Sequence, residues 1–96
     1  SVVRLYTSGL VDYLYDTCMP AGIIVFGSVA KGEDIETSDI DLYAQCNEKK
    51  LDLTTYEPLF KREISLFFEK DFSKLSNELK NNILNGIILK GYLKVF

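Results

Sequence analysis

The sequence predicts an α/β (α+β) fold in which a small mixed β-sheet of about four strands carries helices packed on it. Three observations support this fold class. Residues 23–26 are apolar without interruption, as in a strand that is buried on both faces. Residues 39–46 and 62–68 alternate apolar and polar side chains, which is the period of a strand. Stretches with helical spacing stand before and after these strands, and 96 residues suit a single domain over 1–96.

The N-terminal half predicts one helix, two strands and a polar loop. Apolar residues recur near helical spacing over 4–17, which predicts an amphipathic helix that Gly9 weakens. The central strand over 23–26 ends at Gly27 and Ser28, and a short helical turn follows. Polar residues then form a loop, and the second strand covers 39–46.

The C-terminal half predicts two more helices and two more strands. A loop and a short helix end near Phe60, and a third strand follows over 62–68. A helix is then predicted over 70–86, with Gly86 as its C-cap. Its apolar face consists of Phe72, Leu75, Leu79, Ile83 and Leu84. A short edge strand within 87–96 closes the sheet.

Composition narrows the chemistry that this chain can perform. The net charge of −3 and the lack of a basic stripe disfavour a nucleic-acid partner. No apolar run reaches the ~18–20 residues needed to cross a bilayer, so we expect no membrane association. The chain has no histidine, which excludes His-based metal sites and triads. We expect Cys18 and Cys46, far apart in sequence, to be buried free thiols of a cytoplasmic protein.

Two carboxylates stand at the beginning of the second predicted strand. Because residues i and i+2 of a strand face the same side, Asp39 and Asp41 project together, with Cα atoms about 6.5 Å apart. Two carboxylates this close repel each other unless a cation lies between them. Mg²⁺ is typically held by one or two carboxylates together with substrate phosphates. The pair therefore predicts half of a magnesium site.

The residues before this strand suit the phosphate side of such a site. Gly27 has no side chain to keep a ligand from the backbone, and N–H groups of the following turn can point at an anion. The Ser28 hydroxyl can donate to a phosphate oxygen, and Lys31 adds a positive charge. Walker A and calcium-loop patterns are both absent. The competing interpretation is a polar turn followed by an acidic strand end.

The motif as a whole resembles the minimal nucleotidyltransferases of the polymerase-β-type superfamily, among them the MntA-like antitoxins. Their pattern is Gly-Ser, ten residues and Asp-x-Asp, here Gly27, Ser28, Ala30, Gly32, Ser38, Asp39, Ile40, Asp41 and Leu42. The resemblance implies the nucleotidyltransferase fold and a two-metal Mg²⁺ site at Asp39 and Asp41 when nucleotide is bound. It also implies that Gly27, Ser28, Lys31 and Ser38 bind ATP or another nucleoside triphosphate. AMP, or another nucleotide, would pass to an acceptor hydroxyl.

The family's third carboxylate, on the next strand, is missing from its expected position. Ser65 stands there in this chain, and a neutral hydroxyl cannot replace the charge of a carboxylate. Glu63 has the same strand parity as Ser65 and lies about 6.5–7 Å further along, so we consider it as a catalytic substitute. A solvated residue at the beginning of a strand is the alternative interpretation of Glu63.

The resemblance and the missing third carboxylate lead to two candidate functions. The first is a Mg²⁺-dependent transferase that acts as an antitoxin by modifying a HEPN-type helical partner protein. The second is a catalytically weak or silent module that binds nucleotide and metal and acts by binding a partner. The nucleotide base, the acceptor and the oligomeric state stay open.

Overall fold

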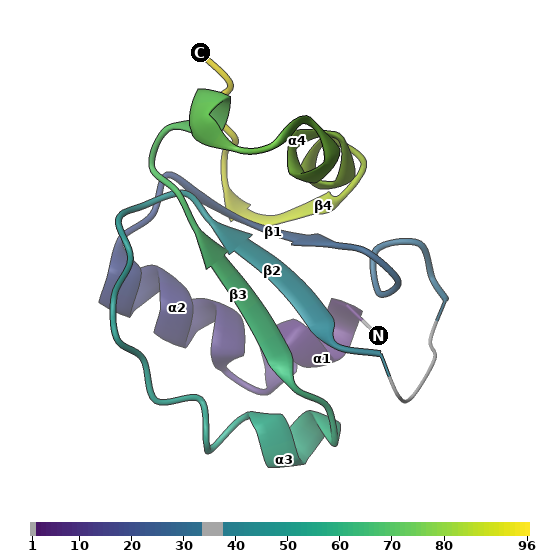
Figure 1. Ribbon diagram of the computed structural model, residues 1–96. Coiled ribbons are helices and arrows are strands. Elements are labelled where there is room, and N and C mark those ends of the chain that lie inside the picture. Colours follow the sequence, from purple (N-terminus) through teal and green to yellow (C-terminus); the bar gives the residue numbers. More distant parts are fainter. Residues whose placement is uncertain (1, 34–37) are drawn as a thin grey trace.

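The computed structural model describes residues 2–33 and 38–96. A four-stranded sheet has the order β3-β2-β1-β4 (Figure 1). β1 pairs antiparallel with both β2 and β4, whereas β2 and β3 run parallel, so the sheet is mixed and the predicted fold class is confirmed. The strands are β1 (Gly22–Phe26), β2 (Ile40–Ala44), β3 (Ile64–Phe68) and β4 (Ile87–Gly91). The helices are α1 (Val2–Thr7), α2 (Leu10–Cys18), α3 (Glu57–Phe60), the 3₁₀ helix η1 (Phe72–Lys74) and α4 (Asn77–Leu84).

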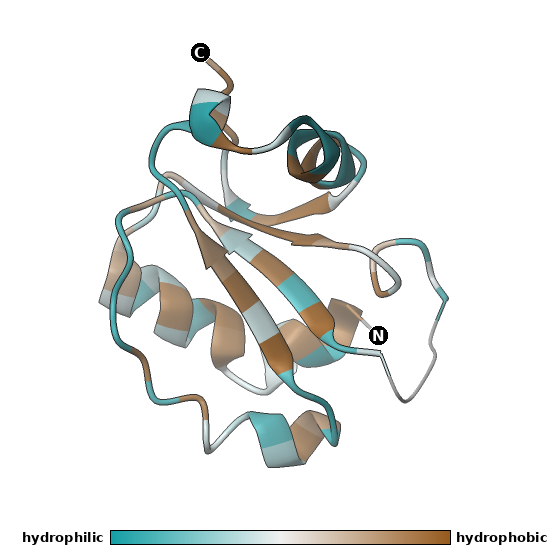
Figure 2. Cartoon of the chain, in the orientation of Figure 1, coloured by the Kyte–Doolittle hydropathy of each residue, from teal (hydrophilic) through white to brown (hydrophobic). Residues whose placement is uncertain are grey.

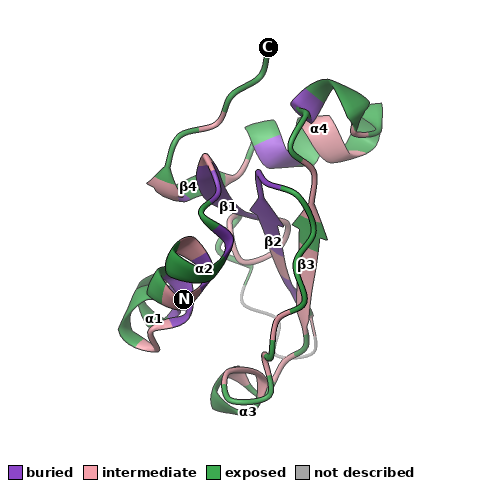
Figure 3. Ribbon diagram, turned by 90° about the vertical axis from the view of Figure 1, so that its left-hand side faces the viewer, coloured by how far each residue is buried: buried purple, intermediate pink, exposed green. Residues whose placement is uncertain are grey.

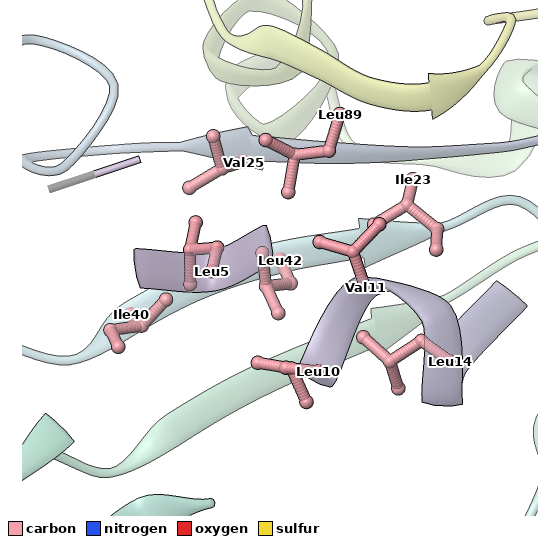
Figure 4. Packing of buried hydrophobic residues seen from close by; sticks show 9 residues of the cluster. All are labelled: Leu5, Leu10, Val11, Leu14, Ile23, Val25, Ile40, Leu42 and Leu89. Carbon is pink, nitrogen blue, oxygen red and sulfur yellow. The ribbon is translucent and has the colours of Figure 1, made fainter. Parts of the chain in front are cut away.

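Helices cover the two faces of the sheet unequally. α1 and α2 pack on one face, and their apolar side chains meet those of β1 and β2 in the larger core cluster (Figure 4). η1 and α4 lie on the opposite face, where Phe72 and Ile83 pack against Ile24, Phe26 and Tyr43. Figure 3 shows the buried strands β1 and β2 between these two layers. In Figure 1 no helix of the described residues crosses in front of β2 and β3, so part of this second face is left open.

β1 is the central strand that the sequence predicts. All five of its residues are buried, because it has a neighbouring strand on each side and helices on each face. β4 lies at the edge of the sheet, as predicted. Figure 2 shows the alternation of β2, where hydrophilic and hydrophobic bands follow one another along the strand. The part of the predicted polar loop at 34–37 lies outside the described residues.

The predicted N-terminal helix is wrong in one respect, because it is divided into α1 and α2. Gly9 separates them and has a φ of 86°, a left-handed conformation that bends the chain. The bend lets Leu5 of α1 and Leu10 of α2 both reach the core. The apolar spacing continues across the break, which is why the pattern alone predicts a single helix.

The predicted C-terminal helix over 70–86 is also divided. Ser76 ends the segment after η1 and begins α4, since its side chain accepts a hydrogen bond from the N–H of Leu79. The C-cap is Asn85 rather than Gly86, which lies one residue further on. Leu84 is 57% exposed, so its place on the predicted apolar face is wrong. Among the described residues, no helix combines the length and apolar character needed to cross a membrane.

Candidate functional site

Asp39 and Asp41 lie at the beginning of β2, on the open face of the sheet. Ile40 and Leu42, which alternate with them, are buried in the core under α1 and α2. The acidic side chains therefore face the opposite side, the side of Phe26 and Tyr43. Asp39 is exposed and Asp41 is half-buried. Strand parity thus brings the two carboxylates to one face, as the sequence predicts.

The sheet surrounds Asp41 with two different neighbours. It is paired with Phe26 of β1 on one side and with Ser65 of β3 on the other. The Ser65 hydroxyl donates a hydrogen bond to Oδ2 of Asp39, at 2.9 Å. Ser65 therefore reaches the acidic pair from the third strand, at the position where the resembled family has a carboxylate. A hydroxyl in this place orients Asp39 but adds no negative charge.

The electrostatic environment of Asp41 disfavours its charged form. Burial raises the pKa of the Asp41 carboxyl above its ordinary value, and the nearby Asp39 carboxylate raises this pKa further. A cation between the two groups would oppose both effects, because opposite charge favours ionisation. Asp41 therefore holds its proton more tightly than an isolated aspartic acid does.

Gly27 leaves the space that the Asp41 carboxylate occupies. It follows β1 directly, has a φ of 72°, and would place a Cβ atom well inside van der Waals contact with Oδ2 of Asp41. Any side chain at this position would displace the carboxylate. The sequence predicts that the missing side chain of Gly27 lets a ligand approach the backbone. The structure shows that it also leaves room for the Asp41 carboxylate.

The segment after Gly27 forms a hydrogen-bonded turn. The N–H of Lys31 donates to the Gly27 carbonyl at 3.2 Å, as in one turn of a helix, and the N–H of Glu33 donates to the Ser28 carbonyl at 2.9 Å. This agrees with the predicted short helical turn. Ser28 is half-buried beside Gly27, and Lys31 is exposed at the far side of the turn. Within the part of the chain that the structure describes, Lys31 forms no ion pair with Asp39 or Asp41.

The two remaining predicted site residues flank the acidic pair. Ser38 is half-buried and directly precedes Asp39. Glu63 is exposed and precedes β3, and its backbone carbonyl accepts a hydrogen bond from the N–H of Ile40. Across 2–33 and 38–96, no three His, Cys, Asp or Glu side chains are grouped so that they could hold a metal ion. The structure therefore brings Asp39 and Asp41 together without Glu63 as a third ligand.

An apolar surface beside the pair was not anticipated as part of the site. Phe26 pairs with Asp41, and Phe67 lies two residues beyond Ser65 on the same face of β3. Their rings are 5.7 Å apart between centroids, and Phe67 is 39% exposed. Sequence alone does not reveal this contact, because it depends on which strands are neighbours in the sheet. The acidic pair thus has a partly exposed aromatic wall next to it.

Comparison with known proteins agrees with this geometry. A family model described as "Polymerase beta, Nucleotidyltransferase" matches residues 9–93 of the chain. Neither a curated protein nor a solved structure matches it. The matched range contains all four strands, the turn after Gly27 and the acidic pair. Since the match spans most of the chain, the protein belongs to the polymerase-beta nucleotidyltransferase family.

Proposed function

We propose that the protein is a Mg²⁺-dependent nucleotidyltransferase that moves AMP from ATP onto an acceptor hydroxyl. One observation carries this proposal: Asp41 is half-buried beside Asp39, against the bare α-carbon of Gly27, where a hydrogen-bonded turn begins. Membership of the family supports nucleotidyl transfer in general. The identities of the nucleotide, the metal and the acceptor go beyond family membership and belong to our proposal.

The acidic pair fits Mg²⁺ by its chemistry. Hard carboxylate oxygens are the protein ligands that this ion prefers, and it commonly takes one or two of them and completes its shell with phosphate oxygens and water. Two such groups are present, and burial together with the nearby Asp39 carboxylate raises the pKa of Asp41. When bound, Mg²⁺ would polarise the α-phosphate and neutralise charge on the leaving pyrophosphate. Among the described residues no third carboxylate is grouped with the pair, so phosphate oxygens and water would complete the shell of the ion.

The chain's own residues would orient the triphosphate. The turn begins at Gly27, next to Asp41, and its Ser28 hydroxyl and first N–H groups would donate to phosphate oxygens. Ser65 would hold the Asp39 carboxylate in place through its hydrogen bond. Lys31 and Ser38, at the two ends of the segment that includes 34–37, would add contacts to the phosphates.

The acceptor that we propose is a hydroxyl on a helical HEPN-type protein, which this protein would neutralise as an antitoxin in the manner of the MntA-like group. A protein acceptor suits the net charge of −3 better than a nucleic acid, whose phosphates would be repelled. Exposed apolar residues at the end of α4 and along β4, namely Leu84, Ile87 and Ile88, offer surface for a protein contact.

Transfer of label tests this function. The protein is incubated with ATP labelled at the α-phosphate, with Mg²⁺, and with the helical protein encoded next to it. We expect the label on that protein. Asp41→Asn should lower the rate by at least about 10²-fold, because electrostatic stabilisation by a bound metal is worth several kcal/mol and each 1.4 kcal/mol is a factor of ten. Asp16→Asn, on the exposed surface of α2, serves as the control. If no protein encoded next to this one acquires the label from ATP, the proposal is contradicted.

Ser65 favours a second function, a module that binds Mg-nucleotide without transferring it. Its hydroxyl stands opposite Asp41 at the third-carboxylate position, so a base for the acceptor hydroxyl is missing there. Ser65→Asp distinguishes the two functions. If this variant gains transfer that the wild type lacks, the native site is silent. If the wild type is active and Glu63→Gln abolishes the activity, the silent module is excluded.

A further inference from the structure

Cys18 and Cys46 are far apart in sequence but meet in the fold. Cys18 is the last residue of α2, and Cys46 lies just beyond the end of β2. Both are buried, with 3% and 8% of their surface exposed, and with Ala44 they form one packed cluster. The two thiols are close enough for each to shift the pKa of the other. The sequence predicts buried free thiols, and the structure makes them a pair.

A pocket of about 430 Å³ opens onto both thiols. Lys49, Lys70 and Lys94 also line it, and none of its described lining residues is acidic. The pocket is therefore positively charged in a protein whose net charge is −3. Cys46 lies five residues beyond Asp41 along the chain, roughly 17 Å at the rise of a strand. The pocket is thus separate from the acidic pair.

The thiols differ in acidity. Burial raises the pKa of both, that of Cys46 to about 11. The interaction between the two thiols raises the pKa of Cys46 and lowers that of Cys18, and Lys49 lowers both. Cys18 is therefore the thiol that loses its proton more readily and attacks an electrophile first.

We propose that Cys18 and Cys46 form a redox-active dithiol, which a small anionic disulfide entering the lysine-lined pocket converts into an intramolecular disulfide. The Cys18 thiolate attacks one sulfur of the reagent, and a mixed disulfide forms as one reagent thiolate leaves. Cys46 then attacks Cys18 and expels the second reagent thiolate. The protein loses two electrons and two protons, and the reagent is reduced to two thiols.

The geometry is suited to this reaction. A disulfide needs Cβ atoms about 3.5–4.5 Å apart, a separation that two side chains of one packed cluster can reach by small movements. The new bond would link the end of α2 to the end of β2. It would also reduce the number of conformations open to the unfolded chain. It would lie at the opposite end of β2 from the acidic pair.

Oxidation of the whole chain by glutathione disulfide tests the proposal. After quenching with acid and alkylation, we expect an intact mass lower by two hydrogen atoms and a peptide that joins Cys18 to Cys46. Addition of excess reduced glutathione should restore two alkylatable thiols. Two unmodified cysteines, two separate glutathione adducts or a covalent dimer would each overturn the proposal. This measurement uses the wild type, so it does not depend on the folding of a variant.

Variants of the pair and of its pocket sharpen the test. Cys46→Ala should stop at a stable glutathione adduct on Cys18, because no second thiol is present to resolve it. Lys49→Met should slow oxidation several-fold, because its charge favours the Cys18 thiolate and the anionic reagent. Lys50→Met, an exposed neighbour outside the pocket lining, should leave the rate unchanged. Equal slowing by both lysine variants, or an internal disulfide in Cys46→Ala, would refute the assignment.

Discussion

Asp41 is held at a position that lowers the stability of the unliganded protein. Its carboxylate is half-buried and lies near that of Asp39, and both features raise its pKa. Sites that bind charged ligands often carry such a cost, which the ligand offsets when it arrives. At the scale of one residue, the metal-binding role that we propose for Asp41 and the stability of the unliganded fold are therefore opposed.

Replacing this residue should make the unliganded protein more stable. Because the folded-state pKa of Asp41 lies above its ordinary value of 3.8, ionised Asp41 destabilises the fold at neutral pH. As the pH falls through the raised pKa, the folded protein binds the proton first and this cost is relieved. We expect Asp41→Asn to raise the midpoint of urea unfolding at neutral pH in EDTA, with the difference disappearing as the pH approaches 3.8.

The control for this measurement is Asp16→Asn, because Asp16 is exposed on α2 and should change the midpoint little. A less stable Asp41→Asn protein at neutral pH would show that the carboxylate makes a favourable interaction instead.

Gly27 and Gly32 offer a matched pair of substitutions. Both have left-handed backbones, with φ of 72° and 73°, so alanine costs each of them about 1 kcal/mol or more of conformational energy. At Gly27 the new Cβ would also meet the Asp41 carboxylate, whereas at Gly32 nothing described lies within 4 Å. We expect Gly27→Ala to be the more destabilising, and to weaken Mg-ATP binding about tenfold or more when measured by calorimetry. Similar loss of binding in both variants would mean that the turn, and not the Asp41 contact, is responsible.

The sequence predicts the acidic pair, but it does not predict the environment of the pair. The spacing of Asp39 and Asp41 is a local property of a strand, and local properties can be derived from strand parity. The contact between Gly27 and Asp41 depends on the antiparallel register that places Phe26 opposite Asp41. Such a register is set by long-range pairing, which a single sequence does not display.

At the scale of elements, every predicted helix and strand exists, and the errors are at helix boundaries. Apolar spacing continues through Gly9 and through Ser76, so periodicity predicts one helix where the chain forms two elements. The breaks are determined by single residues, namely a left-handed glycine and a capping serine. Periodicity averages over several turns and therefore misses them.

The Ser76 cap should contribute measurably to stability. Its side chain accepts the N–H of Leu79 at 3.1 Å, and α4 has only eight residues, so it depends on its cap and on the packing of Ile83. We expect Ser76→Ala to lower the free energy of unfolding by about 1 kcal/mol and Ser76→Asp to retain the wild-type value within a few tenths. Chemical denaturation measures both. An Ala variant as stable as the Asp variant would mean that the exposed cap is not formed in solution.

At the scale of the whole molecule, the arrangement of strands and helices explains why residues far apart in the sequence lie together. β1 lies between β2 and β4, and β3 adds to the outer side of β2. This order brings Ser65 of β3 to the acidic pair at the beginning of β2. The packing of α2 on the sheet brings Cys18 to Cys46, just beyond the other end of β2. Neither meeting can be derived from composition or local periodicity. A family resemblance can predict the first, because it supplies the sheet order, and the pattern offers no signal for the second.

The charge of the whole protein leads to the last prediction, that ATP should stabilise it only in the presence of Mg²⁺. The net charge is −3 and the site is a pair of carboxylates, so ATP alone meets repulsion. With Mg-ATP at 100 times its dissociation constant, binding stabilises the folded state by about 2.7 kcal/mol. In a domain of this size that corresponds to a rise in Tm of roughly 10–20 °C. Differential scanning fluorimetry with Mg-ATP, and with ATP plus EDTA, measures both cases. The Mg-ATP shift should be lost in Asp41→Asn, and equal shifts with and without Mg²⁺ would place the nucleotide away from the acidic pair.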